Sequence, residues 1–167
     1  DCVEFCNKLS ESEGLEKAYL INGREVQCNF ASDGYRLPTE AEWECAGRGG
    51  ESHLYSGSNN IDDVAWYDEN SDGVSHGVGQ KKANGFGLFD MSGNVWEWCW
   101  DWWDDESEDY SSSPTEDPTG DSTGPGRVSR GGGWNCDARD TRLSDRDWYY
   151  PSYRCNDQGF RLSRTIR

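Results

Sequence analysis

The chain has 167 residues, a length that fits one domain with a sizeable core. Only 33% of the residues are hydrophobic, but 9 Trp, 8 Tyr and 5 Phe are present, so aromatic side chains must supply much of that core. Acidic residues outnumber basic ones by 32 to 16, and the net charge of −16 argues against nucleic acid as a partner. No apolar run in the sequence reaches the roughly 18 residues that a membrane span needs.

A helix is predicted at the start of the chain, over residues 1–13. Apolar side chains recur there at helical spacing from Cys2 to Leu9. Gly14 follows them and is a typical stop signal. This helix should therefore be amphipathic.

A second helix is predicted over residues 40–46. Thr39 can cap its first turn, and Glu42, three positions later, can complete a capping box. Gly47 is expected to end this helix, because glycine is a common C-terminal cap.

The rest of the chain is expected to form short strands joined by irregular loops. Short apolar runs, such as residues 64–67 and 87–90, are separated by clusters of Gly, Asn, Asp and Ser. Trp96 and Trp98 alternate with other residues as in a strand that buries one face. Residues 101–126 carry nine acidic and no basic side chains, and a solvated loop is predicted there.

The cysteines and histidines give no sign of a metal or hydrolytic site. The seven cysteines are too few for a disulfide scaffold, and they show no CxxC spacing that would indicate zinc. The two histidines, His53 and His76, lie in separate loop-like segments and are expected at the surface.

Four segments of the chain carry a specific pattern, and they are residues 35–44 (beginning Tyr-Arg-Leu-Pro-Thr-Glu), 84–98 (ending Gly-Asn-Val-Trp-Glu-Trp), 130–134 and 159–161. In this order they resemble the formylglycine-generating-enzyme, or sulfatase-modifying factor, family. The resemblance implies an α+β domain with the C-type lectin fold of the formylglycine-generating-enzyme subclass. Such a domain has short strands, two helices and much irregular loop.

The resemblance implies one domain over residues 1–167, because the predicted first helix also matches the family. Family members normally have further strands before that helix, and their absence here indicates a chain trimmed at its N-terminus. A C-terminal strand at residues 160–162 would be expected to pair near those strands.

Enzymes of this family oxidise a substrate cysteine to formylglycine with copper and oxygen, through two active-site cysteines. The resemblance places Cys136 at the first of these positions and Thr141 at the second. A hydroxyl cannot replace a thiolate as a ligand of copper(I). We therefore expect no enzyme activity, and the alternative is a copper-dependent formylglycine-generating oxidase that acts on sulfatase cysteines.

Residues 135–157 combine an arginine-containing framework with Asn, Asp, Cys, Tyr and Ser. Many of these interspersed residues can be reached from an asparagine codon by changing its adenines alone. The pattern resembles the variable region of treponemal-type variable proteins, which a diversity-generating retroelement diversifies. It implies a noncatalytic display protein whose variable side chains face the solvent and bind a ligand.

The predicted ligand-binding residues combine aromatic rings of large contact area with adaptable polar groups. They are Asn135, Cys136, Asp137, Asp140, Thr141, Asp145, Asp147, Trp148, Tyr149, Tyr153, Cys155, Asn156 and Asp157. The alternative is that the aromatic residues belong to the core, above all Trp148, whose codon is not reachable in this way, and Tyr150. The arginines between them are expected to pair with acidic residues or main-chain carbonyls.

The family resemblance also implies a structural calcium site. Its positions correspond to Asp90, Gly93, Val95 and Glu97, the middle two through their main-chain carbonyls. The alternative for Glu97 is an ion pair with an arginine. No cofactor is required for display.

The expected partner is a protein or glycan on another cell or host surface. The resemblance implies a location at the cell surface or outside the cell, as a lipoprotein whose signal and anchor lie outside this chain. A structural domain without a ligand is the third interpretation, and burial of the variable positions would favour it.

Overall fold

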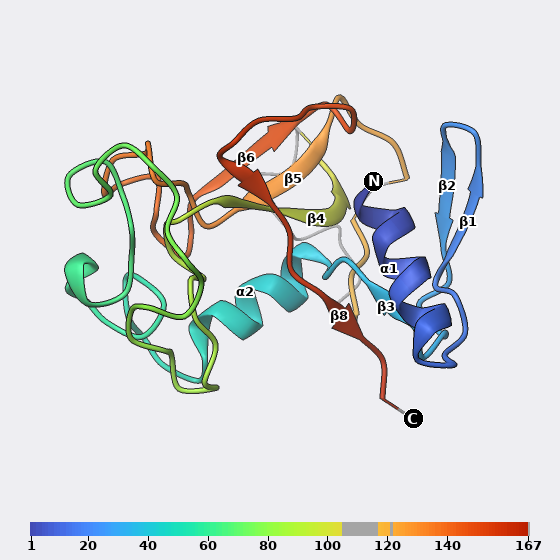
Figure 1. Cartoon of the computed structure of the whole chain (residues 1–167), viewed down its shortest axis with the longest axis horizontal. Coiled ribbons are helices and arrows are strands. Elements are labelled where there is room, and N and C mark those ends of the chain that lie inside the picture. Colours follow the sequence, from blue (N-terminus) through green and yellow to red (C-terminus); the bar gives the residue numbers. More distant parts are fainter. Residues whose placement is uncertain (105–116, 121, 167) are drawn as a thin grey trace. The chain divides into compact units, whose positions relative to one another are not determined.

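A computed structural model describes residues 1–104, 117–120 and 122–166. The described residues form short strands, two helices and one 3-10 helix, joined by long irregular segments (Figure 1). The elements in chain order are α1 (Cys2–Ser12), β1 (Tyr19–Asn22), β2 (Glu25–Cys28), β3 (Tyr35–Arg36), α2 (Glu40–Arg48), η1 (Ile61–Asp63), β4 (Trp96–Trp102), β5 (Arg127–Arg130), β6 (Arg146–Tyr149), β7 (Gln158–Gly159) and β8 (Ser163–Arg164).

The chain divides into two compact units. One consists of residues 1–38 and 160–166, and the other of residues 39–159. The expectation of a single domain over residues 1–167 stays a prediction. Within the described ranges, no helix combines the length and the apolar character that a bilayer crossing requires.

The first unit is built around α1, which confirms the helix predicted over residues 1–13. The hydroxyl of Ser10 accepts a hydrogen bond from the main-chain N–H of Tyr35 at 2.8 Å, and this fixes β3 against the helix. β3 pairs with β8 in antiparallel fashion, and β1 pairs with β2. The strand predicted at residues 160–162 is wrong, because the C-terminal strand begins only at Ser163.

The second unit begins with α2, whose capping box is present as predicted. The Thr39 hydroxyl accepts from the Glu42 N–H at 3.2 Å, and the Glu42 carboxylate accepts from the Thr39 N–H at 2.9 Å. The predicted end at Gly47 is wrong. A Cβ at Gly47 would lie 2.7 Å from Cδ2 of Leu143, so this glycine serves close packing inside the helix. Gly49 ends the helix instead, with a left-handed φ of 57°.

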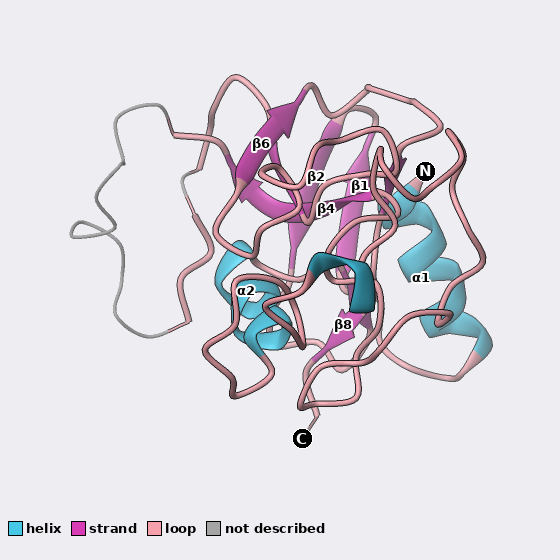
Figure 2. Cartoon of the chain, turned by 90° about the vertical axis from the view of Figure 1, so that its left-hand side faces the viewer, coloured by secondary structure: helices cyan, strands magenta, loops and turns pink. Residues whose placement is uncertain are grey.

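The second unit contains a four-stranded sheet in the order β6-β5-β4-β7. Neighbouring strands are antiparallel except for β4 and β7, which are parallel. β5 lies between β4 and β6, and Figure 2 shows α2 below these strands. The core between the sheet and α2 consists of Trp43, Met91, Cys99, Val128 and Leu143, all of them buried.

β4 differs from the predicted strand with one buried face. Trp96, Glu97, Trp98 and Cys99 are all buried, because α2 and the core cover one side of the strand and other parts of the second unit cover the opposite side. The strand also continues to Trp102, so the first residues of the predicted acidic loop belong to the sheet. Half of that loop, residues 105–116 and 121, lies outside the described residues.

No strand forms at residues 64–67 or 87–90, and both predictions are wrong. The N–H groups of Val64 and Ala65 donate to the carbonyl of Ile61, which closes a turn in place of a strand ladder. Side chains organise these loops. Asn84, for example, donates from its amide nitrogen to the main-chain carbonyls of Ala46 at 2.7 Å and Gly47 at 3.1 Å.

Candidate ligand-binding surface

Residues 135–157 lie in the second unit, between the end of β5 and the start of β7. Gly131 and Gly132 carry the chain out of β5 with positive φ values of 95° and 74°. A Cβ at Gly132 would lie 2.8 Å from the carbonyl oxygen of Asp140, so only glycine lets the start of this segment approach the turn that follows. The chain then passes through turns, forms β6 and returns through an exposed loop to β7.

The two ends of this segment are fixed to one short stretch of chain. Trp134 N–H donates to the carbonyl of Asn94 at 2.8 Å, and Trp96 N–H donates to the carbonyl of Asp157 at 2.7 Å. The side-chain amide of Asn135 also donates to the Asp157 carboxylate at 2.9 Å. The first and last residues of the segment are therefore neighbours in space.

Twelve of the thirteen predicted ligand-binding residues reach the surface at least in part. The exposed ones are Asn135, Asp137, Tyr153, Cys155 and Asn156. The half-buried ones are Cys136, Asp140, Asp145, Asp147, Trp148, Tyr149 and Asp157.

Thr141 is the exception, and the expectation that its side chain faces the solvent is wrong. Its exposed fraction is 0%, and its hydroxyl donates to the main-chain carbonyl of Ala138 at 3.1 Å. Thr141 therefore stabilises the turn beneath the surface.

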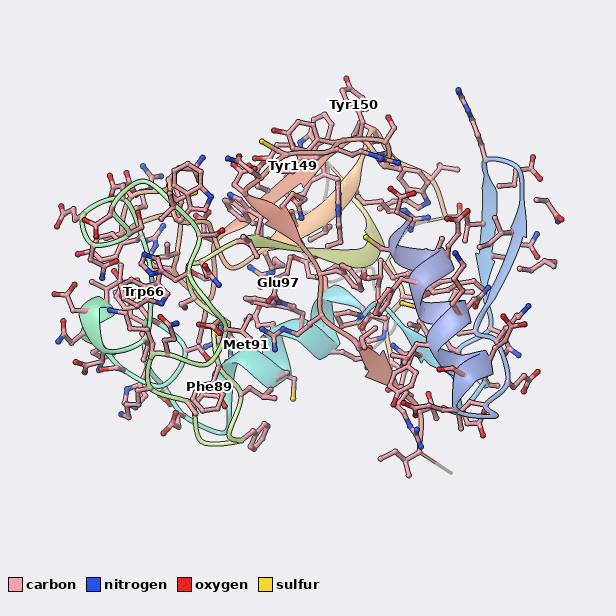
Figure 3. All side chains as sticks on the ribbon, viewed as in Figure 1. Trp66, Phe89, Met91, Glu97, Tyr149 and Tyr150 are labelled. Atoms are coloured by element: carbon pink, nitrogen blue, oxygen red, sulfur yellow. The ribbon has the colours of Figure 1, made fainter. Side chains whose placement is uncertain are left out.

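Trp148 and Tyr150 differ from each other in exposure. Trp148 is half-buried, and a Cβ at Gly126 would lie 2.3 Å from its ring, so the tryptophan packs tightly against the backbone of the loop before β5. Tyr150 is 64% exposed and meets Trp148 edge to face, with ring centroids 5.6 Å apart. Figure 3 shows Tyr149 and Tyr150 close together near the end of β6. The alternative interpretation places Tyr150 in the core, and its exposure shows that it lies on the surface.

Tyr149 and Tyr153 form a stacked pair. Their ring centroids are 4.5 Å apart and their planes differ by 9°. A turn, closed by the Tyr153 N–H and the Tyr150 carbonyl at 2.7 Å, brings the second tyrosine back over the first. Trp98 meets Tyr149 edge to face, with a centroid distance of 6.3 Å, and supports the pair from inside the sheet.

The turns before β6 carry three further carboxylates, those of Asp137, Asp140 and Asp145. Asp137 accepts hydrogen bonds from the N–H groups of Arg139 and Asp140, and so closes the turn that it begins. Partial burial raises the pKa of Asp140, and the nearby charge of Asp137 adds to the rise. The pKa of Asp145 is raised for the same reasons, with Asp140 as the neighbouring charge.

Two arginines of the segment, Arg142 and Arg146, form contacts of the kind that was predicted for them. Arg146 holds the Glu40 carboxylate with two hydrogen bonds of 2.6 and 2.8 Å and so ties β6 to α2. Arg142 donates to the carbonyl of Arg139 at 2.7 Å and lies 3.7 Å from the Asp145 carboxylate. These contacts match the predicted pairing with carboxylates and main-chain carbonyls.

The two cysteines of the segment show no sign of activation. Cys136 is half-buried, and burial raises the pKa of its thiol, which lowers the fraction of reactive thiolate. Cys155 is exposed, and its sulfur lies 3.4 Å from the side-chain oxygen of Asn156. Neither thiol forms a disulfide.

The predicted calcium positions lie where the chain enters β4. Oδ2 of Asp90 accepts from the Gly79 N–H at 2.7 Å, whereas Oδ1 is buried and has no hydrogen-bond partner, which fits a cation ligand. Glu97 is buried and accepts a hydrogen bond from Nε1 of Trp43 at 2.7 Å. No group of three or more Asp, Glu, His or Cys side chains in the described ranges is arranged to hold a metal ion. The calcium site, with its main-chain ligands at Gly93 and Val95, stays a prediction.

One aromatic cluster in the loops of the second unit was not predicted from the sequence. His76 is half-buried and stacks on Trp66, with ring centroids 3.8 Å apart. The Lys81 ammonium lies 4.0 Å from the same indole ring. His76 therefore has a packing role. Loop residues far apart in sequence offer no periodic signal from which such a contact could be predicted.

Comparison with known proteins places these observations in a family. Residues 1–166 match the family model of the sulfatase-modifying factor enzyme 1-like domain. Chaperone protein LppX of Paenibacillus barcinonensis is 36% identical over 200 residues, which cover 99% of this chain and 67% of that protein. Inactive C-alpha-formylglycine-generating enzyme 2 of Bos taurus is 37% identical over 92 residues, which cover 47% of this chain and 30% of that protein.

Two solved structures show the same architecture. Treponema denticola variable protein 1 superposes with a TM-score of 0.90 and 38% identity over 96% of this chain and 66% of its own. PvdO from Pseudomonas aeruginosa superposes with a TM-score of 0.78 and 26% identity over 99% of this chain and 59% of its own. This chain is thus shorter than these relatives. The matches confirm the α+β fold of the formylglycine-generating-enzyme subclass and the resemblance to treponemal variable proteins.

Proposed function

Since the chain belongs to the sulfatase-modifying factor enzyme 1-like family, we propose that it is a noncatalytic display protein whose residues 135–157 form a ligand-binding surface. One observation carries this proposal. Twelve of the thirteen predicted ligand-binding residues reach the solvent at least in part, with Thr141 as the exception, whereas framework residues such as Arg146 hold the backbone through contacts with α2. Diversification by a retroelement would then change the surface without unfolding the domain.

The absence of catalysis rests on the second cysteine position of the enzyme family. Thr141 occupies that position in the sequence, and its hydroxyl is buried and bonded to a main-chain carbonyl. Cys136 stands at the first position with a raised pKa, the opposite of what a copper-binding thiolate needs. An inactive formylglycine-generating-enzyme relative in cattle fits this proposal.

The partner that we propose is a protein or glycan on another cell or host surface. Rigid aromatic rings beside Asn and Asp side chains make a surface of the kind that binders use, because the rings give contact area at low entropic cost. We propose a location at the cell surface, as a lipoprotein, and the name of the relative LppX supports it. Calcium, if it binds at Asp90 and Glu97, would stiffen the loop before β4 and would not take part in ligand binding.

A display library tests this function. The exposed positions Asn135, Asp137, Tyr153, Cys155 and Asn156 are randomised together, and the phage-displayed library is selected against a protein unrelated to the chain, hen lysozyme. A control library randomises five exposed loop positions of the same unit, Asp68, Glu69, Ser75, Val78 and Gln80.

We expect lysozyme binders from the first library, and none from the control library at equal size and equal display level. Failure of the first library, although its members remain protease-resistant and therefore folded, would overturn the display function. The oxidase alternative is tested by incubating the chain with copper(I), oxygen and a cysteine-containing sulfatase peptide. Mass spectrometry should show no formylglycine, and its formation would establish the alternative.

A further inference from the structure

The stacked tyrosine pair has a supported inner side and an open outer side. Trp98 is only 8% exposed and lies beneath Tyr149, so it forms the floor of the cluster. Tyr149 is half-buried and covers one part of Tyr153, which is 37% exposed. Aromatic surface therefore faces the solvent at Tyr153 while the layers below it are fixed.

Two carboxylates flank this pair. Asp147 lies two residues before Tyr149 on the same face of β6, and Asp157 stands where the chain returns to β7. Burial raises the pKa of the Tyr149 hydroxyl, and the charge of Asp147, a hydrogen bond with it and the charge of Asp157 raise it further. The pKa of Tyr153 is raised by its hydrogen bond with Cys155 first, and the charges of Asp157 and Asp147 again contribute.

Two arginines of the sheet near the tyrosine pair, Arg146 and Arg127, make contacts with other groups. Arg146 lies on the opposite face of β6 and binds Glu40. The Arg127 guanidinium lies over the rings of Trp100 and Trp102, 4.2 and 3.9 Å from their centroids. Arg139 and Arg154 are exposed on the same surface, so the surface as a whole carries both signs of charge. The charges of Asp147 and Asp157 act on the Tyr149 hydroxyl, and both are negative.

We propose that Tyr149 and Tyr153, together with Asp147 and Asp157, bind a guanidinium or ammonium group of a basic segment of a partner protein. This inference rests on the proposed function, because it names the ligand chemistry of the same surface. A cation is attracted to the face of an aromatic ring, and a guanidinium can also donate two parallel hydrogen bonds to a carboxylate. The net charge of −16 would favour the approach of a basic partner.

A short peptide with a single cation tests this site. The ¹⁵N-labelled chain is titrated with the pentapeptide Gly-Gly-Arg-Gly-Gly, blocked at both ends, and with the same peptide carrying citrulline, which has the shape of arginine without its charge. We expect amide shifts at Asp147, Tyr149, Tyr153 and Asp157. The affinity for the arginine peptide should exceed that for the citrulline peptide at least fivefold.

Substitutions separate a site from general attraction to an acidic protein. Asp147→Asn with Asp157→Asn should weaken arginine-peptide binding at least fivefold. The matched control, Glu4→Gln with Glu25→Gln, removes two exposed acidic charges from the first unit and should change it less than twofold. Tyr153→Leu keeps apolar area but removes the aromatic face, and it should also weaken binding severalfold.

Equal binding of the two peptides, or equal losses in the two double variants, would overturn the cation site. That result would leave the display function standing, because the lysozyme selection does not require a basic ligand. Conversely, specific arginine binding together with a failed library selection would keep the cation site and reject the display function.

Discussion

Arg130 lies completely buried in β5, and its guanidinium bridges two carboxylates of α2. Its Nη2 atom donates to Glu44 at 2.6 Å, and its Nε atom lies 3.1 Å from Glu40 as an ion pair without good hydrogen-bond geometry. Arg146 in β6 shares the Glu40 carboxylate. The buried Glu40 carboxylate thus joins both β5 and β6, which carry the candidate surface, to α2.

Glu40→Gln should therefore destabilise the fold strongly. It leaves the buried Arg130 with a single charged partner and removes the ion pair of Arg146, so we expect a loss of about 3–5 kcal/mol in the free energy of unfolding. Urea denaturation measures it. Arg48→Gln is the matched control, because it breaks the partly exposed pair with Glu44 and should cost less than about 1 kcal/mol. Similar losses in the two variants would contradict this role of Glu40.

Asp101 should make the stability fall as the pH rises. Burial raises the pKa of this carboxyl to about 7, although it accepts a hydrogen bond from the Glu40 N–H at 2.7 Å. The folded chain therefore holds a proton that the unfolded chain releases near pH 4, and the associated stability is lost as the pH rises through 7.

We expect Asp101 to contribute a loss of about 2 kcal/mol between pH 5 and pH 8. In Asp101→Asn this part of the pH dependence should disappear, because an amide does not titrate. Its oxygen can still accept the hydrogen bond from the Glu40 N–H. Urea denaturation of both proteins at the two pH values measures the difference. Parallel changes in the two proteins would show that Asp101 titrates normally.

Gly47→Ala should destabilise the chain even though alanine is the better helix former. The new Cβ would lie 2.7 Å from the Leu143 side chain in the core, and we expect a net cost of about 1–3 kcal/mol in the thermal or urea unfolding free energy. At Gly77 a Cβ meets only the end of the flexible Gln80 side chain, so Gly77→Ala should change stability by less than about 0.5 kcal/mol. If Gly47→Ala were stabilising, the close packing of α2 on Leu143 would be wrong.

Thr141→Val should cost about 1 kcal/mol of stability, because it leaves the Ala138 carbonyl without its buried hydroxyl donor. Differential scanning calorimetry measures the loss as a lower Tm. Binding of any ligand selected on the surrounding surface should stay unchanged, since the threonine has no exposed atoms. A changed affinity at unchanged stability would return Thr141 to the ligand-binding set.

The predictions from sequence succeeded where the signal was local. The capping box of α2 depends on two residues three positions apart, and Thr39 and Glu42 form it as expected. The end of the same helix was misassigned because a glycine that stops a helix and a glycine that allows close packing look alike. Only the position of Leu143, far along the chain, distinguishes Gly47 from Gly49.

The candidate surface shows the same division. Most residues that the codon pattern picked out reach the solvent at least in part, and the framework residues between them hold the backbone. Exposure of a single residue depends on the tertiary fold, and for that reason the pattern did not reveal that Thr141 is buried and Tyr150 exposed. The structure of the loops before β4 could not be predicted from the sequence. Side-chain hydrogen bonds, such as those of Asn84, hold these loops, and no strand ladder does.

The attachment of residues 135–157 at both ends has a consequence for engineering. Asn94 holds the start of the segment and Trp96 holds its end, so a single three-residue stretch receives both. The segment can therefore be transplanted as one cassette between members of the family. A recipient needs the anchor at residues 94–96, a glutamate that can bind Arg146, and the small residue that Gly47 provides for the packing of Leu143. Binding properties could then be exchanged between proteins without redesigning the domain that carries them.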